Sequence, residues 1–397
     1  MSIAERKKVI YNEFRLLEVD GPGGWRQMRA TQKQIAEELG VSPITVHRAL
    51  NNTGYVSEKL KRIILDYARK VDYVPHRASR TLVRNRTRRI AVFSSENPGY
   101  FWNSVRTGVD IAARQIAAFD YQVRYCMIPD ADSRAYLRRL KASIEQGTEA
   151  VGLVNQWMYD MDDIFAFLDR HGIPYVTFNV DAPHSRRSFF IGPDYPEGGR
   201  LAAEFLGQAL QFKRRAHVLV VSSKTNAMTR SNAPDINGQR VSGFLSVMQN
   251  EFDRIGVDVR YVGPGCHSEE AGRETEHLLE LAMGEFDAVY LVIPHHQPLV
   301  STIERLGLQG KVLTVVHDLD PLTDRYFHDR CFTAVVHQNP IFQGYYTVKM
   351  LEGILESGHP PQTDHINLVH SLILRENRDS DRNHSALTQI LDGWTWW

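Results

Sequence analysis

Residues 31–50 have the sequence TQKQIAEELGVSPITVHRAL, and this stretch decides the fold of the N-terminal part of the chain. Three apolar residues in its first half recur at the spacing of one helix face, namely Ile35, Ala36 and Leu39. Gly40 ends that pattern. Ser42 is a typical N-cap, and Pro43 follows at the first helical position, where proline is tolerated. The stretch therefore predicts two short helices joined by a tight turn.

A third helix is predicted over residues 58–70, after a turn at residues 51–54. Ser57 is its expected N-cap, and Ile63, Ile64 and Ala68 are expected to face inward. Three short helices around a few apolar side chains make a small all-α domain.

The second helix has several side chains that the core does not use. If Val46 and Leu50 face the core, the outer face carries the other side chains of the helix and its cap: Ser42, Ile44, Thr45, His47 and Arg48. A helix that contacts bases in the major groove presents its N-terminal turns, and an arginine there suits a bidentate bond to guanine. We therefore predict DNA contacts for these five residues. The alternative is a helical hairpin whose outer face is only solvated.

Charge is distributed unevenly along a chain that is neutral overall. Residues 1–90 hold 19 Lys and Arg against 9 Asp and Glu, and the whole chain has 47 of each, so residues 91–397 hold 28 against 38. A basic N-terminal part on an acidic body is expected of a protein that binds a polyanion.

Composition excludes several other classes. The 397 residues are 43% hydrophobic and 24% charged, which is ordinary for a globular protein. The three cysteines, Cys126, Cys266 and Cys331, form no CxxC pair, so neither a disulfide framework nor a zinc site is indicated. We see no signal-peptide pattern and no membrane-spanning stretch. The expected compartment is a bacterial cytoplasm, at the nucleoid, and no cofactor is expected.

From residue 89 onward, short β-rich runs alternate with amphipathic helical stretches. This alternation predicts parallel sheets covered by helices on both faces. About 300 residues exceed one comfortable core, so we predict two α/β lobes. Predicted strands cover residues 90–94, 122–127, 150–154, 175–179, 217–222, 288–293, 312–316 and 333–336.

The N-terminal segment resembles the LacI/GalR (lactose-repressor) family. The resemblance is carried by Ile35-Ala36, Gly40-Val41-Ser42-Pro43, Thr45-Val46-x-Arg48-Ala49-Leu50-Asn51, Val56-Ser57, Tyr73-x-Pro75 and Arg80-x-Leu82. His47 departs from the family's usual serine and His76 from its usual asparagine. The resemblance implies a homodimeric transcription regulator, with repression as the expected direction, that binds a pseudo-palindromic operator. It also implies a hinge in which Leu82 enters a central base step while Arg77 and Arg80 neutralise phosphates.

The body resembles the ribose-binding-like, type I periplasmic-binding-protein fold of sugar sensors. Matching motifs include Asn97-Pro98-x-Tyr100-Phe101, Ile191-Gly192-Pro193-Asp194, Arg240-x2-Gly243-Phe244, Val316-His317-Asp318 and Val336-His337-Gln338. The predicted domains are a 1–30 extension, a 31–75 helix-turn-helix domain, a 76–88 hinge and an 89–397 effector-binding and dimerisation domain. The expected effector is a monosaccharide or a cyclic polyol, with a purine less supported.

Sugar recognition needs rings for the C–H faces and amide, carboxylate or guanidinium groups for the hydroxyls. The predicted ligand-binding residues are Tyr100, Phe101, Asn155, Asn179, Asp181, Arg240, His295, Asp318 and Gln338. His295 is included because Pro294-His295 stands where the family often has Asn-Asp.

Each of these assignments has a plainer alternative. An Asn or Asp after a strand is often a turn or cap residue, which leaves Asn155 and Asp181 open. His295, His296 and His317 are interpreted as lining or capping residues, with a metal site the weaker interpretation. A transport-type binding protein and an α/β enzyme acting on sugars are the other function classes, although the chain has no GxxxxGK[ST] or GxSxG motif.

Overall fold

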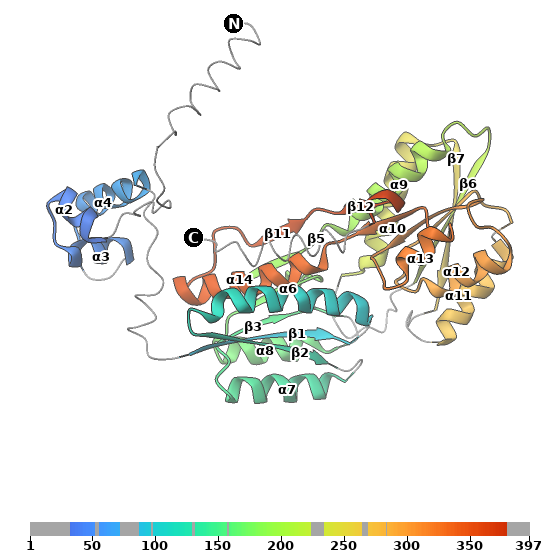
Figure 1. Ribbon diagram of the computed structural model, residues 1–397. Coiled ribbons are helices and arrows are strands. Elements are labelled where there is room, and N and C mark those ends of the chain that lie inside the picture. Colours follow the sequence, from blue (N-terminus) through green and yellow to red (C-terminus); the bar gives the residue numbers. More distant parts are fainter. Residues whose placement is uncertain are drawn as a thin grey trace, which may run out of the picture. The chain divides into compact units, whose positions relative to one another are not determined.

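The computed structural model describes residues 32–51, 55–71, 87–96, 98–128, 132–156, 159–223, 234–263, 269–282 and 284–378 (Figure 1). Three predicted hinge residues, Arg77, Arg80 and Leu82, lie outside the described residues, as do the 1–30 extension and the Trp-rich C-terminal end. The chain divides into two compact units near residue 80. Among the described helices, none is long and apolar enough to cross a membrane.

The N-terminal unit holds three short helices: α2 (Gln32–Leu39), α3 (Pro43–Asn51) and α4 (Glu58–Lys70). Its core contains Ile35, Ala36, Val46, Ala49, Ile64 and Ala68. The two predicted caps are present, because Ser42 Oγ accepts from the Thr45 amide at 3.1 Å and Ser57 Oγ from the Leu60 amide at 3.4 Å. The inward orientation predicted for Ile63 is wrong: its side chain is 46% exposed, since Ile64 and Ala68 already fill that face of α4.

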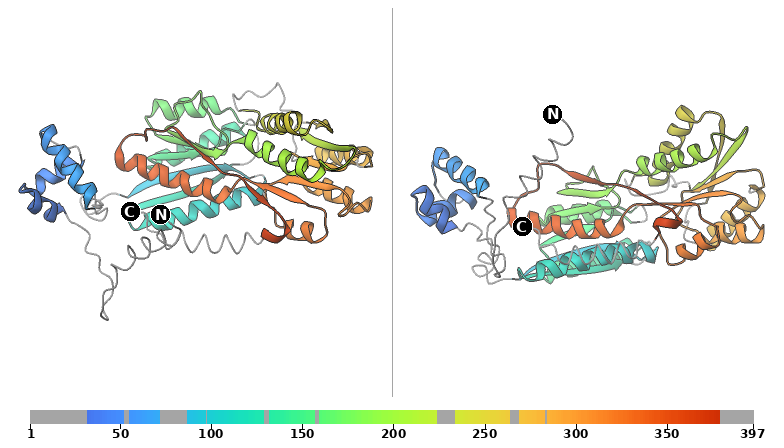
Figure 2. Two further views of the ribbon diagram at one scale, coloured as in Figure 1. Left: turned by 90° about the horizontal axis from the view of Figure 1, so that it is seen from above. Right: turned by 45° about the horizontal axis from the view of Figure 1, so that its top comes forward.

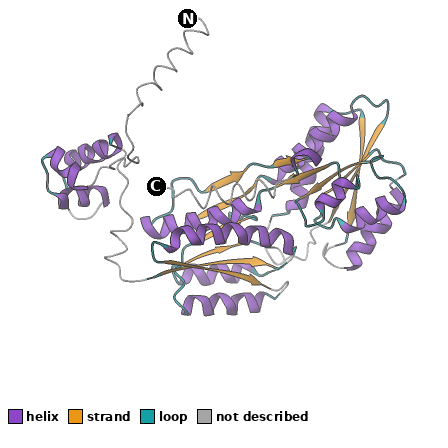
Figure 3. Ribbon diagram, viewed as in Figure 1, coloured by secondary structure: helices purple, strands orange, loops and turns teal. Residues whose placement is uncertain are grey.

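The second unit consists of two α/β lobes (Figures 1 and 3). The first lobe has the sheet order β11-β5-β4-β3-β1-β2, and the second has the order β12-β10-β9-β8-β6-β7. All pairings recorded between these strands are parallel except β10 with β12. The two lobes therefore repeat one doubly wound topology, which confirms the predicted fold class.

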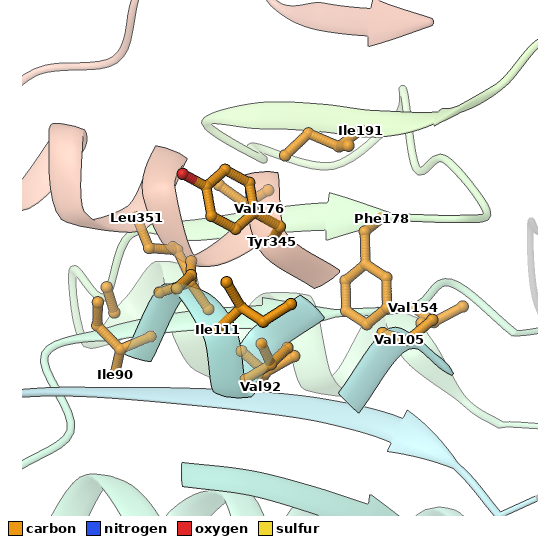
Figure 4. Packing of buried hydrophobic residues seen from close by; sticks show 14 of the residues in the cluster. Ile90, Val92, Val105, Ile111, Val154, Val176, Phe178, Ile191, Tyr345 and Leu351 are labelled. Atoms are coloured by element: carbon orange, nitrogen blue, oxygen red, sulfur yellow. The ribbon is translucent and has the colours of Figure 1, made fainter. Parts of the chain in front are cut away.

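The first lobe is built from β1 (Arg88–Ser95), α6 (Gly99–Ala117), β2 (Tyr121–Ile128), α7 (Ser133–Glu145), β3 (Ala150–Leu153), α8 (Met161–Arg170), β4 (Tyr175–Phe178), β5 (Phe189–Pro193), α14 (Pro340–Ser357) and β11 (His365–Leu368). Helices α6 and α14 cover one sheet face, and α7 and α8 cover the other (Figure 1). Figure 4 shows the first of these layers, where Val105 and Ile111 of α6 and Tyr345 and Leu351 of α14 pack over the strands.

The second lobe is built from α9 (Tyr195–Leu210), β6 (Ala216–Ser223), α10 (Ile236–Glu251), β7 (Ile255–Val262), α11 (Glu269–Ala282), β8 (Ala288–Leu291), α12 (Gln297–Arg305), β9 (Leu313–His317), α13 (Thr323–His328), β10 (Ala334–His337) and β12 (Ser371–Ile373). A 3₁₀ turn at Arg375–Asn377 follows. Here α9 and α10 cover one face of the sheet, while α11, α12 and α13 cover the other.

The chain crosses between the lobes three times, and the crossings lie close to the strand ends (Figure 2). We name them crossing 1 (residues 193–195), crossing 2 (residues 338–340) and crossing 3 (residues 368–371). Asn339 of crossing 2 adopts a left-handed backbone with φ 51°. Its side-chain Nδ2 donates to the Val369 carbonyl at 2.8 Å, which ties crossing 2 to crossing 3.

Paired glycines hold the two covering helices of one face together in each lobe. A Cβ on Gly108 of α6 would lie 1.9 Å from the Ile341 oxygen, and one on Gly344 of α14 would lie 2.0 Å from the Val105 oxygen. Gly199 of α9 and Gly243 of α10 repeat this arrangement, with 1.9 Å to the Arg240 oxygen and 2.1 Å to the Pro196 oxygen. Only glycine permits backbones this close.

Candidate functional site

The outer face of α3 presents the side chains predicted to contact DNA. Val46 and Ala49 are buried on its inner face, which turns Ile44, His47 and Arg48 outward. Ile44 is 62% exposed, so its side chain is accessible for an apolar contact. Thr45 is half-buried because its hydroxyl is 2.8 Å from Ser42 Oγ in the cap. The structure thus brings the five predicted residues together at the N-terminal half of one helix.

In the two-lobed unit, four predicted ligand residues are buried and leave hydrogen-bonding atoms unpaired. Asn155, Arg240, Asp318 and Gln338 are between 0% and 7% exposed. No partner is present for Asn155 Oδ1, Arg240 Nε, Asp318 Oδ1 or Gln338 Oε1. Buried polar atoms are nearly always paired in folded proteins, so several unpaired atoms among residues chosen for ligand binding point to a bound molecule.

Backbone geometry places Asp318 directly beyond the end of β9. Its φ is 65°, a left-handed conformation, and its amide donates to the Val336 carbonyl at 3.0 Å. Asp318 Oδ2 accepts from Gln338 Nε2 at 2.6 Å, which leaves Oδ1 facing away from that bond. His337 Nδ1 is 3.9 Å from Oδ1, beyond hydrogen-bonding distance. Burial raises the pKa of the Asp318 carboxyl, and the nearby Arg240 guanidinium opposes that rise.

The orientations of the Asn155 and Gln338 amides follow from what their nitrogens face. Asn155 Nδ2 donates to the Asp181 carbonyl at 2.7 Å, and Gln338 Nε2 donates to the Asp318 carboxylate. Both partners are acceptors, so only the NH₂ end of each amide fits there. The two amide oxygens are therefore the atoms left unpaired, and together with Asp318 Oδ1 they make three open acceptors.

Arg240 supplies the open donor. It comes from the second turn of α10, where its guanidinium carbon lies 5.1 Å from the centre of the Tyr195 ring. Its single recorded hydrogen bond is a long one of 3.4 Å to the Val292 carbonyl. Asp318 lies close enough to interact with it electrostatically, although the two side chains form no ion pair. A buried guanidinium without a paired carboxylate favours binding of a polar group from outside.

Asn179 and Tyr100 are also at the interface of the lobes, where the Asn179 amide nitrogen and the Tyr100 hydroxyl form hydrogen bonds within the protein. Asn179 follows β4 with φ 62°, and its Nδ2 donates to Gln343 Oε1 at 3.1 Å. The Tyr100 hydroxyl donates across the lobes to the Pro294 carbonyl at 3.0 Å. His295 follows Pro294 and is half-buried. Asn179 and Tyr100 therefore form hydrogen bonds within the protein at the interface of the lobes, where the residues with unpaired acceptors and donor also lie.

Phe101 and Asp181 have structural roles instead. Phe101 is 5% exposed in the core of the first lobe, with its ring centre 4.9 Å from that of Trp102 in an edge-to-face contact. Asp181 binds Arg187 through both carboxylate oxygens, at 2.5 and 2.9 Å, and accepts from the Ala182 amide. The plainer alternative of a turn residue therefore suits Asp181, and we leave both residues out of the proposed site.

Three histidines, His296, His317 and His370, are buried near the site. His296 bonds Asp320 and the His317 carbonyl, both at 2.8 Å, and His317 is 2.7 Å from the Tyr290 hydroxyl. Burial, followed by the charge of Arg240, lowers the pKa of His370 to about 4 and that of His317 well below its ordinary value. Among the described residues, no three His, Cys, Asp or Glu side chains gather as a metal site would require.

Two residues of the network were not identified from the sequence, Tyr195 and Gln343. The Tyr195 hydroxyl donates to the Asn179 carbonyl at 2.9 Å while its ring lies against Arg240. Gln343 is fully buried in the second turn of α14. A polar residue among the apolar positions of α14 was the available indication for Gln343, whereas nothing distinguished Tyr195 from a core tyrosine.

Comparison with known proteins gives two family matches. Residues 90–359 match the periplasmic binding protein domain, and residues 31–76 match the bacterial regulatory proteins of the lacI family. The sucrose operon repressor of Pediococcus pentosaceus is 27% identical over 52% of this chain and 58% of its own length. The transcriptional repressor PurR of Vibrio parahaemolyticus is 27% identical over 45% of this chain and 51% of its own. The chain thus spans little more than half the length of these relatives.

Solved structures agree with this assignment at the level of the fold. GanP, a glucose-galactose binding protein from Geobacillus stearothermophilus, is similar with a TM-score of 0.61 at 20% identity, over 74% of this chain and 99% of that one. A LacI transcriptional regulator from Bacteroides fragilis has the same TM-score at 15% identity, again over 74% and 99%. We conclude that the chain belongs to the periplasmic binding protein domain family through residues 90–359, and that residues 31–76 are a helix-turn-helix region of the lacI type of bacterial regulatory proteins.

Proposed function

We propose that the chain is a sequence-specific transcription repressor whose operator affinity is set by a small sugar-like effector bound between its lobes. The observation that carries the effector part is the set of four buried side chains with unpaired atoms: Asn155, Arg240, Asp318 and Gln338. The matched relatives named as repressors support the direction of regulation. An enzymatic role has no comparable support.

The chemistry of the unpaired atoms favours a hydroxyl-rich effector. Three of the four are acceptors, and one of these is a carboxylate oxygen, so the molecule must bring several donors and no negative charge of its own. Each hydroxyl of a monosaccharide or cyclic polyol donates one hydrogen bond and still accepts another, for example from Arg240 Nε. We therefore propose an uncharged monosaccharide or cyclic polyol as the effector.

On the DNA side, we propose that a homodimer contacts a pseudo-palindromic operator, with α3 of each copy in a major groove. Arg48 and His47 would contact bases, Ile44 a thymine methyl group, and Ser42 and Thr45 the phosphates. Arg77, Arg80 and Leu82 would act in the hinge, and the protein would work in the cytoplasm at the nucleoid. Effector binding would change operator affinity by favouring one arrangement of the lobes.

Two measurements on the full chain test this proposal. A thermal-shift panel of D-ribose, D-arabinose, D-glucose, D-galactose and myo-inositol should give stabilisation that grows with the logarithm of concentration for at least one compound. A duplex selected from random sequence by the protein should then change its affinity when that compound is added. Absence of any sequence-selected duplex would refute the regulator, and Leu82→Ala should bind the selected duplex more weakly and bend it less.

A further inference from the structure

A single buried amide joins the two lobes beside the proposed effector site. Gln343 belongs to α14 in the first lobe and is fully buried. Its Nε2 donates to the Gln338 carbonyl at 2.9 Å, and its Oε1 accepts from Asn179 Nδ2 at 3.1 Å. Gln338 follows β10 of the second lobe, and Asn179 follows β4 of the first. Gln343 therefore spans the end of one strand in each lobe.

The orientation of this amide is determined in the same way as those of Asn155 and Gln338. The Gln338 carbonyl is an acceptor and the Asn179 NH₂ group is a donor, so the Gln343 amide fits in one orientation only. A fully buried amide with both ends bonded resists movement, because breaking either bond leaves a buried polar group unpaired. The link is thus rigid and specific to an amide.

Both partners of Gln343 are one bond away from the open polar atoms. The side chain of Gln338 donates to Asp318, whose Oδ1 is unpaired. The carbonyl of Asn179 accepts from the Tyr195 hydroxyl, whose ring lies against Arg240. A molecule that binds Gln338, Asp318 and Arg240 would therefore act on Gln343 from both sides.

Gln343 also stands where the chain changes lobes. Gln338 and Asn339 form crossing 2, and Tyr195 ends crossing 1, so the path Tyr195–Asn179–Gln343–Gln338 connects the two crossings. A change in the angle between the lobes must rotate the backbone at these crossings. The side chain that holds the two crossings together is positioned to sense or to oppose that rotation.

We propose that Gln343 is a positioning residue that transmits effector occupancy to the arrangement of the lobes. It touches no effector itself in this assignment, and it acts through Gln338 and Asn179. The inference rests on the proposed function. A substitution of a residue that touches the effector would change both effector affinity and the effect of the effector on operator affinity. A substitution of Gln343 should change only the second.

The test compares Gln343→Met with Thr347→Val in the full-length protein. Methionine retains the volume of glutamine but forms neither amide bond. Thr347→Val is the matched control, because the Thr347 hydroxyl donates to the Gln343 carbonyl at 2.7 Å and is equally buried, yet it takes no part in the path between the crossings. The probe is whichever of the five sugars and polyols named above stabilises the wild type most, and the DNA is the selected duplex.

We expect Gln343→Met to bind the probe within about fivefold of wild type, a free-energy change of about 1 kcal/mol. The ratio of operator affinities with and without the probe should fall to near one. Thr347→Val should keep the wild-type ratio. A wild-type ratio in Gln343→Met would overturn the inference, as would a loss of ratio that only parallels weaker probe binding. If no probe alters operator affinity of the wild type, the proposed function fails first and the inference with it.

A second variant, Gln343→Glu, tests the hydrogen bonds themselves. One carboxyl oxygen still accepts from Asn179, but an ionised second oxygen faces the Gln338 carbonyl and repels it. Burial raises the pKa of such a carboxyl, and the Asp318 carboxylate beyond Gln338 adds to this rise. The Arg240 guanidinium, which lies against the ring of the neutral Tyr195, opposes it. Protonated, the carboxyl donates to Gln338 as the amide does. The ratio should therefore recover from pH 8 to pH 6 relative to wild type; a ratio independent of pH would contradict the proposed bonds.

Discussion

Replacing Gly199 with alanine should weaken folding and effector binding together, because the new methyl group meets backbone. The added Cβ would lie 1.9 Å from the Arg240 oxygen and 2.9 Å from the Phe244 nitrogen. Side-chain Cβ contacts below 3.0 Å essentially do not occur, so α9 and α10 must separate by about 1 Å. No rotamer change relieves the contact, since the opposing atoms belong to the main chain of α10.

The magnitude follows from two opposing effects. Overpacking by one methylene costs about 1–3 kcal/mol, and contact with backbone puts Gly199→Ala near the upper end of that range. Alanine gains about 1 kcal/mol over glycine in a helix interior. The free energy of unfolding should therefore fall by about 2 kcal/mol. Gly353→Ala is the matched control, because its Cβ would meet nothing within 4 Å, and it should raise stability by up to about 1 kcal/mol.

Urea unfolding followed by tryptophan fluorescence measures this difference, and the two alanine variants should differ by about 3 kcal/mol. Separation of α9 from α10 also moves Arg240, so Gly199→Ala should lose most of the thermal stabilisation that the best sugar or polyol gives the wild type. Gly353→Ala should keep it. If the two variants unfold within about 0.5 kcal/mol of each other, the close helix contact does not hold Arg240 in place and the reasoning is wrong.

Three further predictions concern the DNA face, the effector and pH. Arg48→Ala should lose binding to the selected duplex in a mobility-shift assay while the thermal shift with the best sugar is unchanged; retained affinity would remove Arg48 from the DNA face. A sugar phosphate should bind at least about tenfold more weakly than its parent sugar by calorimetry, since it brings negative charge to Asp318, and equal affinities would contradict the three open acceptors. Because His370 has a folded pKa of about 4 against 6.5 when unfolded, its neutral form contributes stability above pH 6.5 that is lost as pH falls towards 4. The free energy of unfolding should be about 2 kcal/mol lower at pH 5 than above pH 6.5 on account of this residue. His370→Asn should make the free energy of unfolding depend less on pH, and an unchanged pH dependence would contradict the low pKa of His370.

Periodicity predicted the architecture well because buried parallel strands carry unbroken apolar runs. All eight predicted strands are present, and the alternation with helices correctly indicated two doubly wound lobes. Four strands were missed, and three of them, β7, β11 and β12, lie at the sheet edges. The fourth, β5, is internal and buried, but its apolar run of three residues ends at Gly192-Pro193. In β11, residues 365–367 are exposed, so no apolar run marks it. Pairing with β5, not local pattern, makes this segment a strand.

The candidate site was harder to predict, because residue type and position after a strand do not determine whether a side chain forms a hydrogen bond within the protein or stays open to a ligand. Asp181 and Asp318 both follow a strand, yet Arg187 engages the first and leaves the second open. Arg187 is six residues away from Asp181, and nothing in the spacing distinguishes that pair from a solvated one. Phe101 and Tyr100 are neighbours on α6, and only the helix phase decides that one enters the core and the other meets Pro294.

The repeated topology shows how the two lobes divide their roles. Asn179 after β4 and Asp318 after β9 occupy equivalent places, with φ 62° and 65°, and each amide bonds to the neighbouring strand. In the second lobe the Asp318 side chain has an open carboxylate oxygen, while in the first the Nδ2 of Asn179 donates to Gln343. The same left-handed backbone conformation therefore positions an open ligand-binding oxygen at Asp318 and a hydrogen bond to Gln343 at Asn179. Because Asn155 of the first lobe also has an open oxygen, both lobes contribute to the proposed effector site. The Gln343 link lies beside that site, so a change in the angle between the lobes must involve the residues that connect them.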